Sequence, residues 1–77
     1  MISDRLKGII LRELDLDDFS IDESTVAYMV PGWDSLNHVR IINAIETEYD
    51  LHFKTVELIR LRNVGDLQAL LDRYTSK

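Results

Sequence analysis

The chain has 77 residues, 45% hydrophobic and 30% charged, which suits one small folded domain rather than a disordered tail. Its formal net charge of -5 repels phosphate backbones and anionic lipid heads, so nucleic acid and membrane surfaces are poor partners. The lack of cysteine excludes disulfides, thiolate metal sites and cysteine nucleophiles, and no apolar run is long enough to span a bilayer. We therefore expect a single-domain, monomeric protein of the cytoplasm over residues 1–77.

The first predicted helix runs from Ser3 to Leu14. Ser3 is a suitable N-cap, and Asp4 places a negative charge at the positive end of the helix dipole. Its apolar residues recur at helical spacing: Ile2, Leu6, Ile9, Ile10 and Leu14.

A long ordered loop is predicted from Asp15 to Asp34, because this stretch is rich in aspartate, contains Pro31-Gly32 and shows no sustained period. Loops of this length in compact domains are usually functional. We expect the apolar residues of the loop to pin it to the core: Phe19, Ile21, Val26, Tyr28, Met29 and Val30.

The second predicted helix, from Ser35 to Tyr49, has the clearest pattern. Asp34 is its expected N-cap. Its expected inward stripe is Leu36, Val39, Ile42, Ile45 and Tyr49, widened by Ile41 and Ala44. This helix should be the central element of the fold.

Two further helices complete the prediction. A short one is expected from Thr55 to Leu61, and a longer one after Asn63, whose side chain is a suitable N-cap with Asp66 three residues on. The last helix should end near Tyr74 and bury Val64, Leu67, Leu70 and Leu71. No alternating segment predicts a sheet, so the expected fold is all-α, a small four-helix bundle with a long first loop and a short third helix.

Ser35 is the candidate site of chemistry, because it stands at the first position of the second helix. Backbone N–H groups there lack helical partners and the dipole favours anions, so a phosphate ester at this position would be well placed. Asp34 and Ser35 are also ordinary helix-start residues, so this pair alone does not separate a modified serine from a simple cap.

Three segments in order make the chain resemble the acyl carrier protein family over nearly its whole length. Residues 32–36, Gly-Trp-Asp-Ser-Leu, resemble the family's Asp-Ser-Leu modification site. Residues 44–53 resemble the exit of its second helix, with acidic residues, an aromatic and an aspartate. Residues 63–67, Asn-Val-Gly-Asp-Leu, are similar to the Thr-Val-Gly-Asp-Leu opening of its last helix.

The resemblance implies that the chain is a carrier and not an enzyme, with the bundle fold of acyl carriers. Ser35 would receive 4′-phosphopantetheine from coenzyme A through a phosphopantetheinyl transferase, with Asp34 and Leu36 completing the attachment site. The terminal thiol would hold an acyl or aminoacyl group as a thioester. A loading enzyme and downstream biosynthetic enzymes would be its partners.

The resemblance also assigns a partner surface to the second helix. Carriers of this family meet basic patches on enzymes with acidic residues, which map here to Asp34, Glu46, Glu48 and Asp50. A solvated helix face is the alternative reading of these charges. Arg40 and Val39 belong to the same expected surface.

Two positions depart from carriers of fatty-acid synthesis, which commonly have acidic residues two and five positions after the serine. This chain has Asn37 and Arg40 there. With Trp33 before Asp34-Ser35, the pattern looks more like stand-alone carriers of polyketide, nonribosomal peptide or other dedicated pathways. Trp33 is expected to anchor the loop on the bundle.

Other functions have weaker support. Asp34, Ser35 and His38 are the residue types of a hydrolase triad, but Asp34 is a cap and so small a bundle offers little shelter from water. His38 and His52 lack the spacing of metal ligands, so no metal site is expected. An unmodified helical interaction module remains the main alternative to a carrier. Six apolar residues could part slightly to shelter a short acyl chain, and they are expected to be core first: Leu36, Val39, Ile42, Ile59, Leu61 and Val64.

Overall fold

The computed structural model describes residues 2–76, which form four α-helices and one short 3-10 turn. The α-helices are α1 (Asp4–Glu13), α2 (Ser35–Tyr49), α3 (Thr55–Leu58) and α4 (Val64–Thr75), and the 3-10 turn is η1 (Ala27–Met29). The all-α prediction is confirmed. None of the helices within the described residues is long and apolar enough to cross a membrane.

The three longer helices begin where their caps predict. The Ser3 side chain accepts from the backbone N–H of Leu6, and the Asn63 side chain accepts from that of Asp66. Asp34 does the same for α2, which spans Ser35–Tyr49 as expected. Capping side chains of this kind take up backbone donors that the first turn of a helix leaves without partners.

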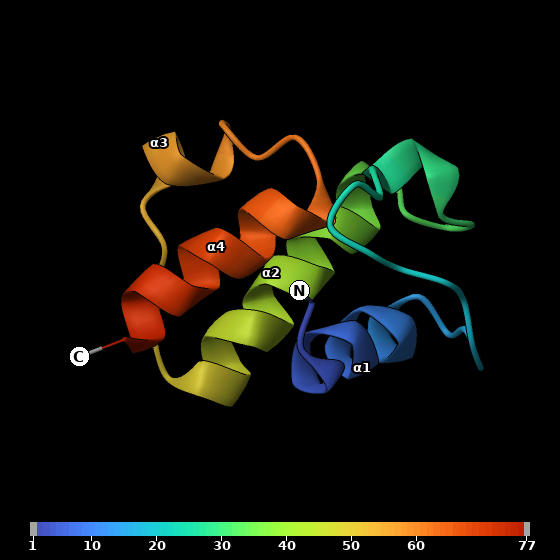
Figure 1. Cartoon of the computed structure of the whole chain (residues 1–77), viewed down its shortest axis with the longest axis horizontal. Helices are drawn as coiled ribbons and strands as arrows, with labels where there is room; N and C mark the ends of the chain where they lie inside the picture. The colour runs from blue at the N-terminus through green and yellow to red at the C-terminus, as the bar shows by residue number, and fades with distance from the viewer. Residues whose placement is uncertain (1, 77) are drawn as a thin grey trace.

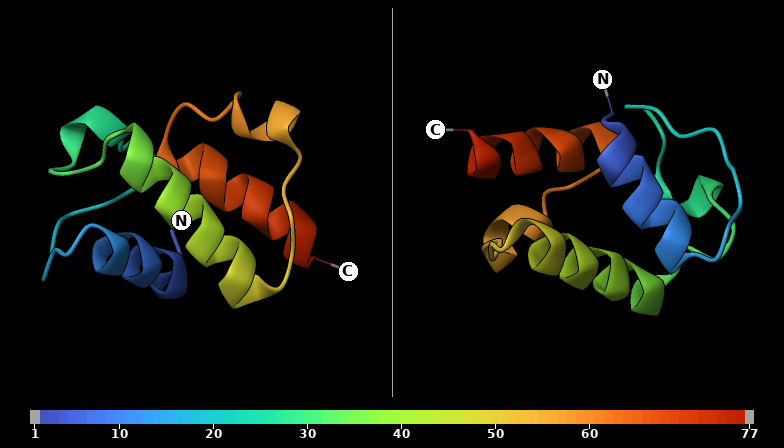
Figure 2. Two further views of the ribbon diagram at one scale, coloured as in Figure 1. Left: turned by 180° about the vertical axis from the view of Figure 1, so that it is seen from behind. Right: turned by 90° about the horizontal axis from the view of Figure 1, so that it is seen from below.

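The helices are arranged with α2 and α4 running in the same general direction and α1 running against them (Figures 1 and 2). Parallel neighbours need a return connection, and the segment that contains α3 supplies it. As a result the first turns of α2 and α4 lie at the same end of the molecule, beside η1.

The core lies between α1, α2 and α4. Its fully buried side chains come from all three helices and are Leu6, Ile10, Ile41, Ile45, Leu67 and Leu71. A buried amide links two of these helices, since the Ser3 backbone N–H donates to Gln68 Oε1 over 2.9 Å.

The long loop is held at several points. Val30–Trp33 forms a type II turn, with Pro31 at its second position and Gly32 at its third with φ of 82°. The Trp33 N–H closes this turn by donating to the Val30 carbonyl over 3.2 Å. Only glycine adopts such a backbone conformation readily, so this turn explains why Pro-Gly precedes α2.

Two backbone carbonyls of the same loop accept hydrogen bonds from the first turn of α4. The Val64 N–H donates to the Thr25 carbonyl over 2.8 Å, and the Gly65 N–H donates to the Glu23 carbonyl over 2.9 Å. These bonds use α4 donors that have no helical acceptor. The loop is therefore docked on the last helix.

The prediction for the apolar loop residues is correct only in part. Ile21 and Val30 are buried, and Phe19 and Val26 are half-buried. Tyr28 is 88% exposed and Met29 is also exposed, so they do not pin the loop. Both lie in η1, which bulges outward beside the start of α2.

The stripe predicted for α2 is also partly wrong. Ile41, Ile42 and Ile45 face the core, whereas Leu36 is 63% exposed and Val39 is exposed as well. At 100° per residue, Leu36 is turned about 180° from Ile45. The helix thus carries apolar residues on two faces, and α1 and α4 cover only one of them.

The third helix is shorter than predicted, because it ends at Leu58 rather than Leu61. Two tighter turns follow at its end. The Arg60 N–H donates to the Glu57 backbone carbonyl, and the Leu61 N–H donates to the Leu58 carbonyl. Ile59 lies in this segment and is 76% exposed, so its assignment to the core is wrong. Ile42 and Val64 are buried as expected, and Leu61 is half-buried.

Candidate functional site

Ser35 occupies the first helical position of α2 and is exposed. Within residues 2–76 its hydroxyl makes no hydrogen bond. The type II turn precedes it, and α2 behind it is anchored in the core by Ile41, Ile42 and Ile45, so the backbone is fixed on both sides. Ser35 is therefore a free hydroxyl at a rigid point of the surface.

Asp34 organises the backbone around this serine. Its Oδ1 accepts from the Asn37 N–H over 2.8 Å, and its own carbonyl accepts from the His38 N–H over 2.8 Å. Asn37 adds a bond from its side-chain amide to the Gly32 carbonyl over 2.6 Å. The N–H groups of Ser35 and Leu36 are left without helical acceptors, as in any first turn, and can receive an anion.

A tryptophan and a histidine lie beside the serine. Trp33 is buried, as predicted for a loop anchor, and its indole N–H donates to His38 Nδ1 over 3.1 Å. The two rings are stacked, 25° apart in plane. Burial lowers the pKa of His38 below its ordinary value, because it disfavours the charged ring.

A shallow groove of about 580 Å³ opens next to these rings, lined by Ser35, Asp34, Trp33, His38 and Arg62 among others. Arg62 reaches it from the segment that precedes α4. The groove continues into a hollow of about 60 Å³ that shares Trp33, His38 and Arg62. Residues far apart in the chain thus meet on one side of the serine.

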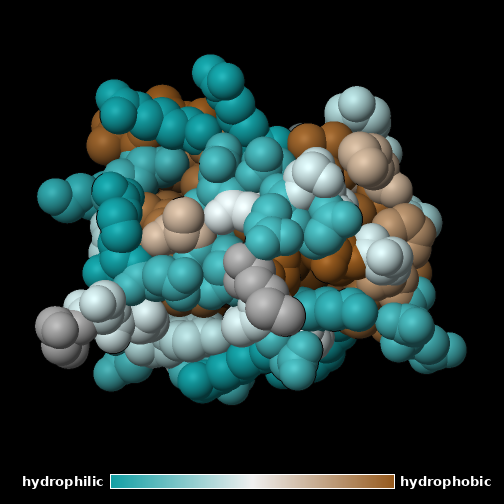
Figure 3. All heavy atoms as spheres, viewed as in Figure 1, coloured by the Kyte–Doolittle hydropathy of each residue, from teal (hydrophilic) through white to brown (hydrophobic). Residues whose placement is uncertain are grey.

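Exposed apolar side chains surround this end of the molecule. Figure 3 shows apolar atoms gathered where η1 lies in that view, with a further apolar patch at α3. We call the four exposed apolar residues nearest the start of α2 the apolar rim: Tyr28, Met29, Leu36 and Val39. Surface of this kind is typical of contact with other proteins.

The acidic residues proposed for partner contact differ in their surroundings. Glu48 lies near the end of α2, where its carboxylate pairs with the Arg5 guanidinium at 3.2 Å. Arg5 also stacks over the Tyr49 ring. Asp50 is exposed and ends α2 in the left-handed conformation.

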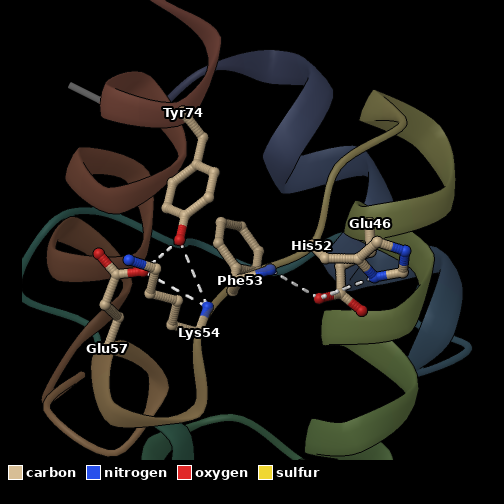
Figure 4. A network of polar contacts seen from close by, with 6 residues as sticks. All are labelled: Glu46, His52, Phe53, Lys54, Glu57 and Tyr74. Carbon is tan, nitrogen blue, oxygen red and sulfur yellow. Dashed lines mark hydrogen bonds and ion pairs between the residues drawn. The ribbon is translucent and has the colours of Figure 1, made fainter.

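Glu46 is the most engaged of these acids (Figure 4). Its carboxylate accepts from the Phe53 backbone N–H over 2.9 Å and lies 3.9 Å from His52 Nδ1. It therefore holds the chain that leaves α2. Arg40, by contrast, is exposed and forms no ion pair within residues 2–76.

Figure 4 also shows how α3 is held. The Tyr74 hydroxyl donates to Glu57 and accepts from the Lys54 backbone N–H, and Arg73 pairs with Glu57 at 3.1 Å. We call these four residues the α3 clasp. The hydrogen bond from Tyr74 is the main cause of a lowered Glu57 pKa, and it raises the pKa of Tyr74 in turn.

The structure offers little to a hydrolase. His38 Nδ1 is occupied by Trp33, and Asp34 is occupied by its capping bond to Asn37, so neither is arranged to activate Ser35. In the part of the chain that the structure describes, no three metal-ligating side chains come together. His38 lies near the start of α2 and His52 lies beyond its far end.

Sequence reasoning missed the Trp33–His38 pair and Arg62. The pair spans five residues across a helix start, where no helical period applies. Arg62 stands 27 positions after Ser35, and only the return of the chain through α3 brings it to the groove.

Comparison with known proteins is consistent with this geometry. The family described as "Phosphopantetheine attachment site" matches residues 4–71. The chain belongs to the acyl carrier protein family. An acyl carrier protein of Clostridium acetobutylicum is 29% identical over 77 residues, which cover the whole of both chains. One from Caulobacter vibrioides is 27% identical over 97% of this chain and 96% of its own.

The structural comparison leads to the same family. A holo acyl carrier protein from Geobacter metallireducens, solved by NMR in solution, matches with a TM-score of 0.85 and 37% identity. The match covers 91% of this chain and 80% of that one. The protein is therefore an acyl carrier, not a catalyst, and its prosthetic group is 4′-phosphopantetheine.

The residues at the start of α2 fit such a group. A phosphodiester needs a free hydroxyl for attachment and donors for its oxygens, and Ser35 with the first-turn N–H groups has both. When bound, the arm supplies a thiol for acyl transfer. The chain itself would supply a fixed attachment point, since Asp34 and the Val30–Trp33 turn hold the backbone around Ser35 in place.

Proposed function

We propose that Ser35 carries the 4′-phosphopantetheine arm, and that all 77 residues act as one carrier domain. A phosphopantetheinyl transferase would join the Ser35 oxygen to the phosphorus of the pantetheine phosphate of coenzyme A, with 3′,5′-ADP leaving. The observation that carries this proposal is the exposed, unbonded hydroxyl of Ser35 at the capped start of a rigid helix.

The cargo in this proposal is an acyl or aminoacyl group held as a thioester on the arm. A monomeric carrier in the cytoplasm would present it to a loading enzyme and to downstream enzymes. Asn37 and Arg40 support a dedicated pathway, such as polyketide or nonribosomal peptide synthesis, over fatty-acid synthesis, because they stand where carriers of fatty-acid synthesis commonly have acidic residues.

The partner surface is proposed to combine the apolar rim with charges along α2. Val39 and Arg40 lie close to the serine, and Glu48 and Asp50 lie at the far end of the helix. Complementary charges steer encounters and set orientation, while exposed apolar residues supply contact area. Glu46 would contribute by holding the exit of α2 rather than by direct contact, because its carboxylate is engaged.

The test is intact mass after incubation with coenzyme A, Mg²⁺ and a broad-specificity transferase. Wild type should gain one phosphopantetheine group and Ser35→Ala none. Ser20→Ala, which removes another exposed serine, is the matched control and should gain the group as wild type does. If wild type gains nothing under these conditions, an unmodified helical interaction module becomes the better reading.

A further inference from the structure

The groove beside Ser35 is lined by aromatic rings and a cation, which is the composition of a binding site. Its lining includes the aromatic rings of Trp33, His38 and Tyr28 and one cation, Arg62. Ser35 itself is part of the lining. Any group attached to the serine would therefore start inside the groove.

His38 has a defined hydrogen-bonding state there. An indole N–H can only donate, so His38 Nδ1 must accept the 3.1 Å bond from Trp33. The neutral ring then carries its proton on Nε2. His38 thus offers one donor, which no acceptor within residues 2–76 uses.

Arg62 is the second unused group. Its backbone N–H donates to Asp66 Oδ2, but its guanidinium forms no ion pair in the part of the chain that the structure describes. A guanidinium is planar, always charged and suited to bidentate binding of phosphate. Asp34 is the one acidic residue in the lining, and its carboxylate is held by the Asn37 N–H.

We propose that this groove is a resting site for the phosphopantetheine arm. Arg62 binds the phosphodiester, the pantetheine chain lies against Trp33, and His38 donates from Nε2 to an amide carbonyl of the arm. The inference rests on the proposed attachment at Ser35.

Covalent attachment makes weak contacts sufficient. A short tether holds its end at an effective concentration in the millimolar range, so a site whose intrinsic dissociation constant is about millimolar is occupied roughly half of the time. An aromatic wall, one donor and one cation form a site of that modest strength. The arm would then exchange between the groove and solvent, free to leave for a partner enzyme.

The chain offers a direct optical test, because Trp33 is its only tryptophan. Holo protein is prepared as above, and its mass confirms complete loading. We expect its Trp33 emission and the His38 ring resonances to differ from those of unloaded protein. His52, whose side chain is 93% exposed beyond the far end of α2, should be unchanged and serves as an internal reference.

Two arginine variants identify the cation. Holo Arg62→Gln should lose most of the change in Trp33 emission, and the phosphorus resonance of its arm should differ from that of holo wild type. Holo Arg60→Gln, which removes an equal charge from an exposed position outside this groove, should keep the change in Trp33 emission and the phosphorus resonance of holo wild type. Far-UV circular dichroism checks that both variants keep the helical fold.

The outcomes separate the two proposals. Failure to load wild type would contradict the proposed function. Complete loading with unchanged Trp33 and His38 signals would overturn the resting site alone. Equal signals in holo Arg62→Gln and holo Arg60→Gln would likewise overturn it, because Arg62 would then have no part in holding the arm.

Discussion

At Gly65 the loop and α4 approach more closely than a side chain allows. A Cβ built on Gly65 would lie 2.7 Å from the Glu23 carbonyl oxygen and 2.8 Å from the Glu23 Cβ. The contact includes backbone on both sides, so it cannot be relieved by a side-chain rotation. This explains in physical terms the glycine of the Asn-Val-Gly-Asp-Leu segment.

Gly65→Ala should therefore lower the free energy of unfolding by about 1 to 3 kcal/mol, the usual cost of overpacking. Urea denaturation measures the change. Gly8→Ala is the matched control, because a Cβ there meets nothing within 4 Å. Gly8 lies inside α1, so this second substitution should instead stabilise by about 0.5 to 1 kcal/mol. If Gly65→Ala and Gly8→Ala changed the free energy of unfolding equally, the close approach of Gly65 to Glu23 would be contradicted.

His38 should make stability depend on pH. Burial lowers its pKa in the folded state from the ordinary 6.5, whereas the unfolded chain keeps the ordinary value. Below that pH the unfolded state binds more protons than the folded state, so the free energy of unfolding falls as the pH falls. The loss levels off below the folded pKa.

Urea unfolding between about pH 7.5 and 5.5 tests this. His38→Gln, whose amide oxygen can still accept from Trp33, should reduce the slope of stability against pH. His52→Gln should leave the contribution of His38 intact. A slope that persists undiminished in His38→Gln would exclude burial of this histidine as its cause.

At the scale of elements, α3 is a single turn that depends on the α3 clasp. Tyr74→Phe removes the hydroxyl but keeps the ring, which contacts Phe53 edge to face at 5.0 Å. We expect faster amide exchange over residues 55–58 and a rise of the Glu57 pKa toward its ordinary value, because the Tyr74 hydrogen bond is the main cause that lowers it. Both are measured by NMR.

Tyr28→Phe is the control for this substitution, since it removes a hydroxyl from an exposed ring in η1. It should change neither the amide exchange over residues 55–58 nor the Glu57 pKa. Unaltered exchange of α3 in Tyr74→Phe would mean that the remaining contacts hold the turn without the hydroxyl.

The elements also show what sequence could and could not predict. The start of α2 follows from local chemistry, since Asp34 caps a periodic segment directly after Pro-Gly. The inward face of α2 does not, because Leu36 and Ile45 are both apolar and lie on opposite sides of the helix. Only the packing of α1 and α4 decides which of them is buried, and that packing is not a local property.

At the scale of the whole molecule, the apolar rim should matter for contact and not for stability. Leu36→Ala should change the free energy of unfolding by less than about 0.5 kcal/mol, as is usual for exposed sites. Ile42→Ala, in the same helix but buried, should cost about 2 to 5 kcal/mol. Thermal or urea unfolding of the two variants measures the contrast.

The same variants test the rim as a contact surface. Leu36→Ala should slow loading by the transferase although the fold is intact, and the time course of the mass gain measures this rate. A loading rate equal to that of wild type would remove Leu36 from the proposed surface.

The site as a whole was predictable only where it is continuous in the chain. Asp34, Ser35 and Leu36 form one short motif, and the family resemblance assigns their roles. The groove brings Arg62 to Trp33 and His38 through the return of the chain, and no local pattern carries that information. Long-range topology, rather than residue type, therefore accounts for the part that sequence analysis missed.

The docking of the loop on α4 also gives synthesis of the chain an order of events. Ser35 is made well before Val64 and Gly65, whose N–H groups hold the Thr25 and Glu23 carbonyls. Until the ribosome has released the first turn of α4, the loop ahead of the serine lacks these two bonds, although the Val30–Trp33 turn can already form. The docking of residues 23–25 is therefore completed late, and a chain cut short before residue 64 would present Ser35 without these two loop contacts.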